Sequence, residues 1–182
     1  MSLMKLKKLS HGQRGFTLIE LLIVIALTGI IATAVTMSIG QVFTSTIRSN
    51  DQNTAINQVS NAAYWISRDA QMAKPGTIVV NNDTENEIFL ELLCWESWNA
   101  TGNYSIIYKL ELSDGLKELR RYYDGDSTGT PIARYIKPKN EGETWCHWEN
   151  GVLSVNITAQ VGINNITETR TFQVKPRPDE SG

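Results

Sequence analysis

The sequence predicts an α+β fold in which one long N-terminal helix packs against an antiparallel β-sheet. Three observations lead to this prediction. Residues 21–47 carry no charge, and residues 48–73 repeat apolar side chains with a helical period. The rest of the chain contains short segments rich in β-branched and aromatic residues, bounded by turn signals. The first half of the helix is therefore expected to span a membrane, and the second half to be amphipathic.

The uncharged segment is long enough to cross a lipid bilayer. At about 1.5 Å per residue, its 27 residues extend for about 40 Å, which exceeds the thickness of a hydrocarbon core and leaves room for tilt. Basic residues precede it, and lysine and arginine beside a span stay on the cytoplasmic side. We therefore expect a membrane-spanning helix over residues 16–47, with the chain after it outside the cytoplasm.

The helix is expected to continue past the membrane. Apolar residues recur at spacings of three and four in a single seam, formed by Ile56, Val59, Ala63, Ile66 and Ala70. The first proline after residue 16 is Pro75, which disfavours helix in the residue before it, and Gly76 suits a turn. These signals predict one helix from about Phe16 to about Ala73.

The remaining chain is expected to form strands at residues 77–80, 88–95, 104–112, 116–123, 131–136, 152–161 and 168–174. Two of these segments alternate in the manner of half-buried strands. The inward set is predicted to be Ile106, Tyr108, Leu110 and Leu112 in one, and Val155, Ile157 and Ala159 in the other, with Asn156 and Thr158 outward. Residues 48–175 should form the globular domain, and residues 176–182 an extended, flexible tail.

The N-terminal region resembles a known family. Gly15, Phe16 and Glu20, followed by about 20 apolar residues, resemble the class III signal of bacterial type IV pilins and type II secretion pseudopilins. The resemblance implies that a prepilin peptidase cleaves between Gly15 and Phe16 and methylates the amine of Phe16. Residues 1–15 would then be a leader peptide, and residues 16–47 would become the filament core after assembly. An ordinary secretory signal has a shorter apolar region and a different cleavage site.

The resemblance also implies a role for Glu20 and a set of partners. A carboxylate within a membrane span is costly and is by default a functional hypothesis. In the filament, each Glu20 would meet the N-terminal amine of a neighbouring subunit and act in assembly. The implied partners are prepilin peptidase, other pilin or pseudopilin subunits and the inner-membrane assembly platform.

A second resemblance covers more of the chain. Residues 66–73, which include Arg68 and Asp69, resemble the helix end of J-type minor pseudopilins and related minor pilins. The segments 106–110, 119–121 and 170–174 resemble their strands. Major pilins commonly have a proline within the helix and two cysteines near the C-terminus, whereas Cys146 here lies far from the C-terminus. A minor subunit is therefore expected, and pilus, secretion and competence systems all remain open.

Charge and motifs argue against several other functions. The leader contains four basic residues and no acidic one, so its removal changes the formal charge from −2 to −6. A chain this acidic is a poor nucleic-acid binder, because phosphate contacts need clustered lysine and arginine. No nucleophile elbow, phosphate loop or metalloprotease helix occurs. Cys146 and His147 alone supply too few zinc ligands. We expect neither an enzyme nor a cofactor.

Two pairs of residues leave alternatives open. Cys94 and Cys146 either form a disulfide, which an extracytoplasmic location permits, or are two buried thiols that never meet. Asp124 and Asp126 open a segment that resembles a calcium loop, but its twelfth position is Tyr135 rather than glutamate. A solvated turn is expected there, and these two aspartates remain a minor calcium candidate.

Two functions of different class follow from these observations. The chain is either a structural subunit of an extracytoplasmic filament or a membrane-anchored binding module that does not polymerise. Glu20 distinguishes them, because a simple anchor has no use for a carboxylate in its span, whereas an assembling helix does.

Overall fold

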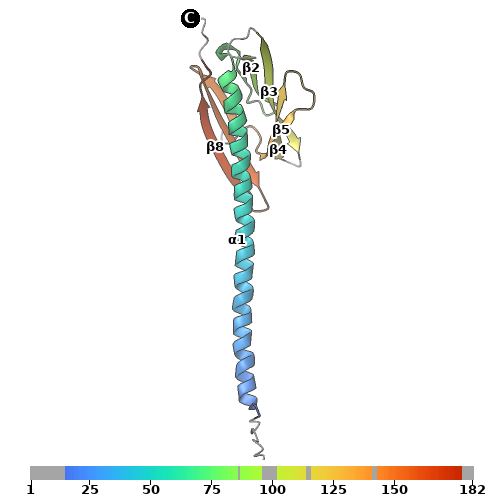
Figure 1. The fold of residues 1–182 in the computed structure, drawn as a ribbon, viewed down its shortest axis with the longest axis vertical. Coiled ribbons are helices and arrows are strands. Elements are labelled where there is room, and N and C mark those ends of the chain that lie inside the picture. The colour runs from blue at the N-terminus through green and yellow to red at the C-terminus, as the bar shows by residue number, and fades with distance from the viewer. Residues whose placement is uncertain (1–14, 86, 96–101, 114–115, 141–142, 178–182) are drawn as a thin grey trace, which may run out of the picture. The chain divides into compact units, whose positions relative to one another are not determined.

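The computed structural model describes residues 15–85, 87–95, 102–113, 116–140 and 143–177 (Figure 1). The chain divides into two compact units, Met1–Ser45 and Thr46–Gly182. The helix α1, Leu18–Met72, contributes to both. The predicted helix is therefore present, with each end within two residues of its expected limit. Most of the predicted leader, residues 1–14, lies outside the described residues.

In the first unit, the described part of α1 is exposed along its whole length. Its hydroxyl side chains donate back to carbonyl oxygens one turn earlier. Examples are Thr28 Oγ1 to Val24 O at 2.6 Å, Thr36 Oγ1 to Ala32 O at 2.9 Å and Ser38 Oγ to Ala34 O at 2.9 Å. These bonds satisfy hydroxyl donors that hydrocarbon could not satisfy, so the segment is compatible with a membrane span. Within the described residues, α1 is the one helix long and apolar enough to cross a membrane.

In the second unit, α1 is followed by the short 3₁₀ turn η1 (Pro75–Thr77) and, within the described residues, by eight strands. The strands are β1 (Val79–Val80), β2 (Ile88–Trp95), β3 (Asn103–Ser113), β4 (Leu116–Tyr123), β5 (Thr130–Ile136), β6 (Trp145–Glu149), β7 (Val152–Val161) and β8 (Ile166–Val174). The order along the sheet is β1-β2-β3-β4-β5-β7-β6, with β8 paired to β7, and all pairs are antiparallel. An α+β fold with a helix on an antiparallel sheet is thus confirmed.

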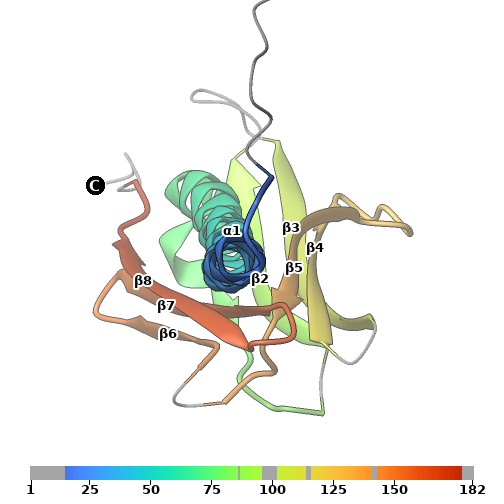
Figure 2. The ribbon, with the colours of Figure 1, turned by 90° about the horizontal axis from the view of Figure 1, so that it is seen from below.

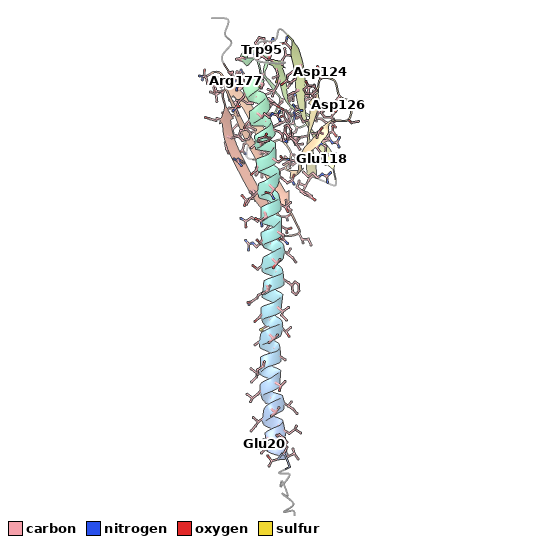
Figure 3. All side chains as sticks on the ribbon, in the orientation of Figure 1. Glu20, Trp95, Glu118, Asp124, Asp126 and Arg177 are labelled. Carbon is pink, nitrogen blue, oxygen red and sulfur yellow. The ribbon has the colours of Figure 1, made fainter. Side chains whose placement is uncertain are left out.

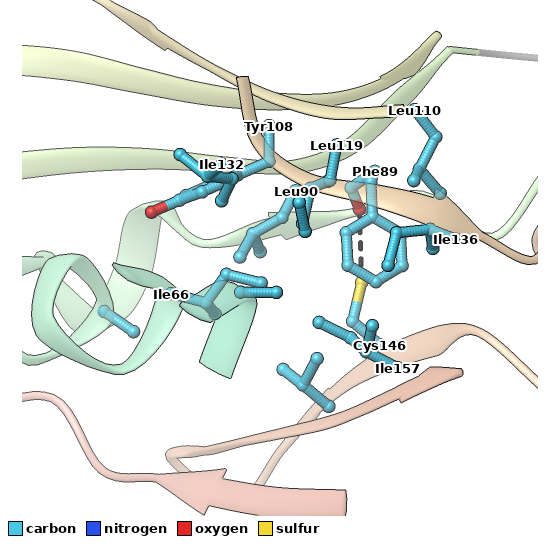
Figure 4. Close-up of a cluster of buried hydrophobic side chains, with 14 of the residues drawn as sticks. Ile66, Phe89, Leu90, Tyr108, Leu110, Leu119, Ile132, Ile136, Cys146 and Ile157 are labelled. Atoms are coloured by element: carbon cyan, nitrogen blue, oxygen red, sulfur yellow. Dashed lines mark hydrogen bonds between the residues drawn. The ribbon is translucent and has the colours of Figure 1, made fainter. Parts of the chain in front are cut away.

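The sheet curls so that α1 lies between two groups of strands (Figure 2). One group runs from β2 to β5, and the other contains β6, β7 and β8. The groups are joined where Ile136 of β5 pairs with Ala159 of β7. The core fills the space between helix and strands (Figure 4), with large buried side chains such as Phe89, Tyr108 and Ile157.

The buried face of α1 differs from the predicted seam at one end. Ile56 is 41% exposed, so its predicted inward position is wrong. The face is instead formed by Ala55, Val59, Ala62, Ala63, Ile66 and Ala70. Strands approach the helix from two sides, which buries a wider face than a single seam, and alanines allow the close approach. Periodicity alone could not distinguish Ile56 from its neighbour Ala55.

Three predicted strands, 88–95, 116–123 and 152–161, agree with β2, β4 and β7 at both ends. The segment 77–80 is shorter than predicted, because its first residue belongs to η1 and only Val79–Val80 pairs. Strand β6, Trp145–Glu149, is not among the predicted strands. It forms by pairing with β7 across the turn at Asn150 and Gly151, which have φ of 52° and 76°.

Two alternation predictions were also wrong. Leu112 is 71% exposed. Strand β2 begins at Ile88 opposite Lys109, so the end of β3 extends beyond it. Asn156 and Thr158 are buried rather than outward, because the segment before β6 covers that face of β7. Both side chains donate to the carbonyl oxygen of Glu143, at 2.8 and 2.6 Å.

The start of the predicted flexible tail is held against the helix. Pro176 is buried, and the Arg177 N–H donates to Gln71 O at 3.3 Å. Residues 178–182 lie outside the described residues.

Candidate processing and assembly site

The bond implied as the cleavage site lies in exposed chain just before the helix. Gly15, Phe16 and Thr17 have no regular secondary structure, and α1 begins at Leu18. Phe16 is exposed, and no heavy atom outside Gly15 and its two neighbours in the chain lies within 4 Å of the position that a Cβ would occupy on Gly15. The peptide bond between Gly15 and Phe16 is therefore accessible to another protein.

Glu20 lies on the first turn of α1 (Figure 3) and takes part in a capping arrangement. The Glu20 N–H donates to Thr17 Oγ1 at 3.3 Å, and the Thr17 N–H donates to Glu20 Oε2 at 3.4 Å. This reciprocal pair is a capping box, which satisfies two backbone donors at the start of a helix. The negative charge of the carboxylate also interacts favourably with the positive end of the helix dipole. The Thr-x-x-Glu spacing could have indicated it from the sequence. Glu20 remains exposed, so its carboxylate is also available to a second chain.

A second polar cluster joins the helix to the sheet. The carboxylate of Asp69 on α1 is 4% exposed and lies between Arg121 of β4 and Tyr108 of β3. Arg121 donates from Nε to Asp69 Oδ2 at 2.6 Å and from Nη2 to Oδ1 at 3.2 Å. The Tyr108 hydroxyl donates to the same Oδ2. We call these three residues the Asp69 cluster.

In the Asp69 cluster, the buried negative charge is balanced by a positive charge and by hydrogen bonds. A buried carboxylate is stable only when it is paired and hydrogen-bonded, and a two-pronged arginine contact is a strong form of such pairing. Burial, and then the charge of Asp69, raise the pKa of Tyr108 well above its usual value, so its hydroxyl stays protonated and donates. The Arg121 guanidinium also lies 5.3 Å from the ring centroid of Trp65 on α1. The cluster therefore sets the position of α1 relative to β3 and β4.

The Asp69 cluster brings together segments that lie far apart in the sequence. Asp69 belongs to the helix end, and Tyr108 and Arg121 belong to the strand pair, on which the resemblance to minor subunits rests. All three residues lie within those sequence patterns, but nothing in the patterns indicates that they contact one another.

The two cysteines do not meet. Both are free and buried. The Cys146 thiol donates to Phe89 O at 3.1 Å (Figure 4), whereas the Cys94 thiol donates to Asp69 O at 3.5 Å. Phe89 and Cys94 are five residues apart on β2, or about 16 Å at 3.3 Å per residue, far beyond the Cα separation that a disulfide allows. Burial raises the pKa of each thiol to about 12, which keeps both protonated and unreactive near neutral pH.

The calcium candidates lie in the turn between β4 and β5, at the periphery of the sheet (Figure 3). Asp126 Oδ1 accepts from both the N–H and the hydroxyl of Thr128 at 3.0 Å, and these bonds lower the pKa of Asp126. Asp124 is exposed. Within the described residues, no group of three or more potential metal-ligating side chains comes together. The calcium assignment stays a prediction.

Residues 10–36, which contain Gly15, Phe16 and Glu20, match the family model described as the prokaryotic N-terminal methylation motif. This chain carries that methylation motif. The match supports the resemblance to type IV pilins and pseudopilins, and the helix packed on an antiparallel sheet is pilin-like. No curated protein and no solved structure gives a match to this pilin-like chain.

Proposed function

We propose that this pilin-like chain is a minor subunit of an extracytoplasmic filament, either a type IV pilus or a type II secretion pseudopilus. Prepilin peptidase cleaves it between Gly15 and Phe16 and methylates the new amine. The mature subunit is held in the inner membrane by α1, with its C-terminal domain outside the cytoplasm, and an assembly platform then transfers it into the filament. The observation that carries the proposal is the methylation motif, which contains Glu20 and leads directly into an exposed helix that carries no charge from residue 21 to residue 47.

The exposed apolar helix supports assembly as well as anchoring. Along residues 18–47 its large apolar side chains are all exposed, so they require lipid or other helices to cover them. Outside the membrane the same side chains would be exposed to water unless neighbouring helices replaced the lipid. A bundle of such helices is the arrangement in which Glu20 could pair with the amine of another subunit, which offsets the cost of burying its charge.

The minor-subunit assignment rests on the Asp69 cluster. The sequence segments that resemble minor pseudopilins supply its three residues, and they contact one another at the helix–sheet junction. A shared internal contact is a physical reason for those segments to occur together in one chain.

The capping box is also compatible with the alternative function, a membrane-anchored binding module. It gives Glu20 a role within its own subunit, which a membrane-anchored binding module that never polymerises could also use. A test of the proposal must therefore separate capping from docking.

The test compares Glu20→Leu with Thr17→Val in the full chain. Both variants break the capping box, but only Glu20→Leu removes the carboxylate. We expect Glu20→Leu to lower co-purification with sheared filaments by a hundredfold or more, because a buried amine loses its counter-charge. Thr17→Val should assemble to within a few-fold of wild type.

Intact mass and membrane level serve as controls, since both variants should be inserted and begin at Phe16. Equal assembly of Glu20→Leu and wild type would contradict the filament function. Equal loss in both variants would show that Glu20 acts through the cap rather than through a neighbour.

A further inference from the structure

Ile163 has an unusual position for an apolar residue. It is 98% exposed, the most exposed large apolar side chain among the described residues. It lies in the turn between β7 and β8, within a stretch, residues 150–167, that carries no charge. Single exposed apolar side chains are common on protein surfaces. The position of Ile163 along α1 suggests a specific role for this side chain.

Strand β8 runs beside the second half of α1 and in the same direction (Figure 1). Three contacts establish this alignment: Gln52 Nε2 to Glu168 Oε1 at 3.2 Å, Arg170 Nη1 to Ser60 Oγ at 2.9 Å, and Arg177 N to Gln71 O at 3.3 Å. Residue numbers thus rise together along the two elements. The β7–β8 turn, residues 162–165, precedes β8 and therefore lies toward the N-terminal end of this part of the helix.

The packing of Gly162 shows more closely where the turn lies along the axis of α1. A Cβ added to Gly162 would lie 2.0 Å from Asp51 Oδ2, so the turn packs directly on α1 at Asp51. Asp51 is four residues after Ile47, the last residue of the uncharged run, or about 6 Å along the helix axis. The β7–β8 turn therefore lies at the level where the uncharged run ends and Arg48 supplies the first charge.

We propose that the β7–β8 turn contacts the outer surface of the lipid bilayer in the unassembled subunit, with Ile163 at the boundary between headgroups and acyl chains. The inference rests on the proposed membrane span. The occupant is lipid because the uncharged run that would cross the hydrocarbon ends beside the turn. A turn without charged residues enters the interfacial zone at little cost, and an apolar side chain gains from burial there.

This contact gives the globular unit a second attachment to the membrane. A domain held by one helix can rotate about the membrane normal and tilt, whereas a second contact on one side of the helix restricts the tilt. The subunit would then present a constant face to its partners before it leaves the membrane.

The test measures depth in the mature full chain, reconstituted in vesicles of phosphatidylethanolamine and phosphatidylglycerol. An environment-sensitive NBD dye is attached to Ile163→Cys. The matched control is Glu149→Cys, which is exposed and lies opposite Val152, at the other end of β7. The two ends of β7 are nine residues apart, or about 30 Å along the strand. Unsubstituted protein gives the background, because Cys94 and Cys146 are buried.

We expect the dye at residue 163 to show blue-shifted emission and at least threefold stronger quenching by brominated lipids than the dye at residue 149. Equal, weak quenching at both positions would overturn the proposal. Equal, strong quenching would also overturn it, because the whole unit would then lie on the membrane. A dye can itself favour lipid, so a second measurement is needed.

The second measurement uses amide hydrogen exchange of residues 162–166 in the same vesicles, without a dye. Exchange should be several-fold slower in the unsubstituted chain than in Ile163→Ser, whose fold is unaffected because residue 163 contacts solvent. Equal exchange rates would overturn the contact. Neither result depends on filament assembly, so failure here leaves the proposed function standing, and failure of Glu20 to act in assembly leaves the membrane contact standing.

Discussion

At the scale of single residues, Asp69 is the side chain on which the helix–sheet junction depends most. Asp69→Asn removes the charge that neutralises the partly buried Arg121, so we expect the free energy of unfolding to fall by about 3–5 kcal/mol. Arg134→Gln is the matched control: its side chain is 63% exposed, and loss of its ion pair with Glu118 should cost less than about 1 kcal/mol. Thermal unfolding of the full chain in mild detergent, followed by tryptophan fluorescence, measures both. Equal effects would contradict a structural role for the Asp69 cluster.

At the scale of elements, the buried face of α1 can be tested by two substitutions that lie six residues apart on the helix. Ala62→Leu places a large side chain where the exposed fraction is 0%, and we expect a loss of about 1–3 kcal/mol from overpacking. Ile56→Ala shortens a side chain that is 41% exposed, and should cost less than about 1 kcal/mol. The same unfolding measurement applies. A larger loss from Ile56→Ala would restore the seam predicted from periodicity.

At the scale of the whole molecule, the division into two units predicts that the globular unit folds without the span. A fragment that starts at Ser49 keeps every residue of the buried helix face and all eight strands. We expect it to be soluble, with mixed helix and sheet in circular dichroism and one cooperative thermal transition. A shorter fragment starting at Asn61 loses Ala55 and Val59 from the core and should melt at a lower temperature. Aggregation of the longer fragment would show that the unit needs more of α1.

Local sequence determined the features that depend on neighbours along the chain. The uncharged run is visible residue by residue, and Pro75 with Gly76 marks the helix end because backbone restriction is local. The methylation motif is a contiguous pattern, so Gly15, Phe16 and Glu20 could be identified without a fold. The limits of β2, β4 and β7 followed from turn residues and β-branched runs for the same reason.

Only the tertiary structure decided features that depend on segments far apart in sequence. Asp69 and Arg121 are 52 residues apart, and the local sequence around either residue does not indicate that the two form an ion pair. The separation of Cys94 from Cys146 follows from the register of β2 and the position of β6, and the burial of Asn156 follows from the segment that covers β7. The choice of Ala55 over Ile56 follows from strands on two sides of the helix. Period and propensity describe one element at a time, whereas burial is a property of the elements that surround it.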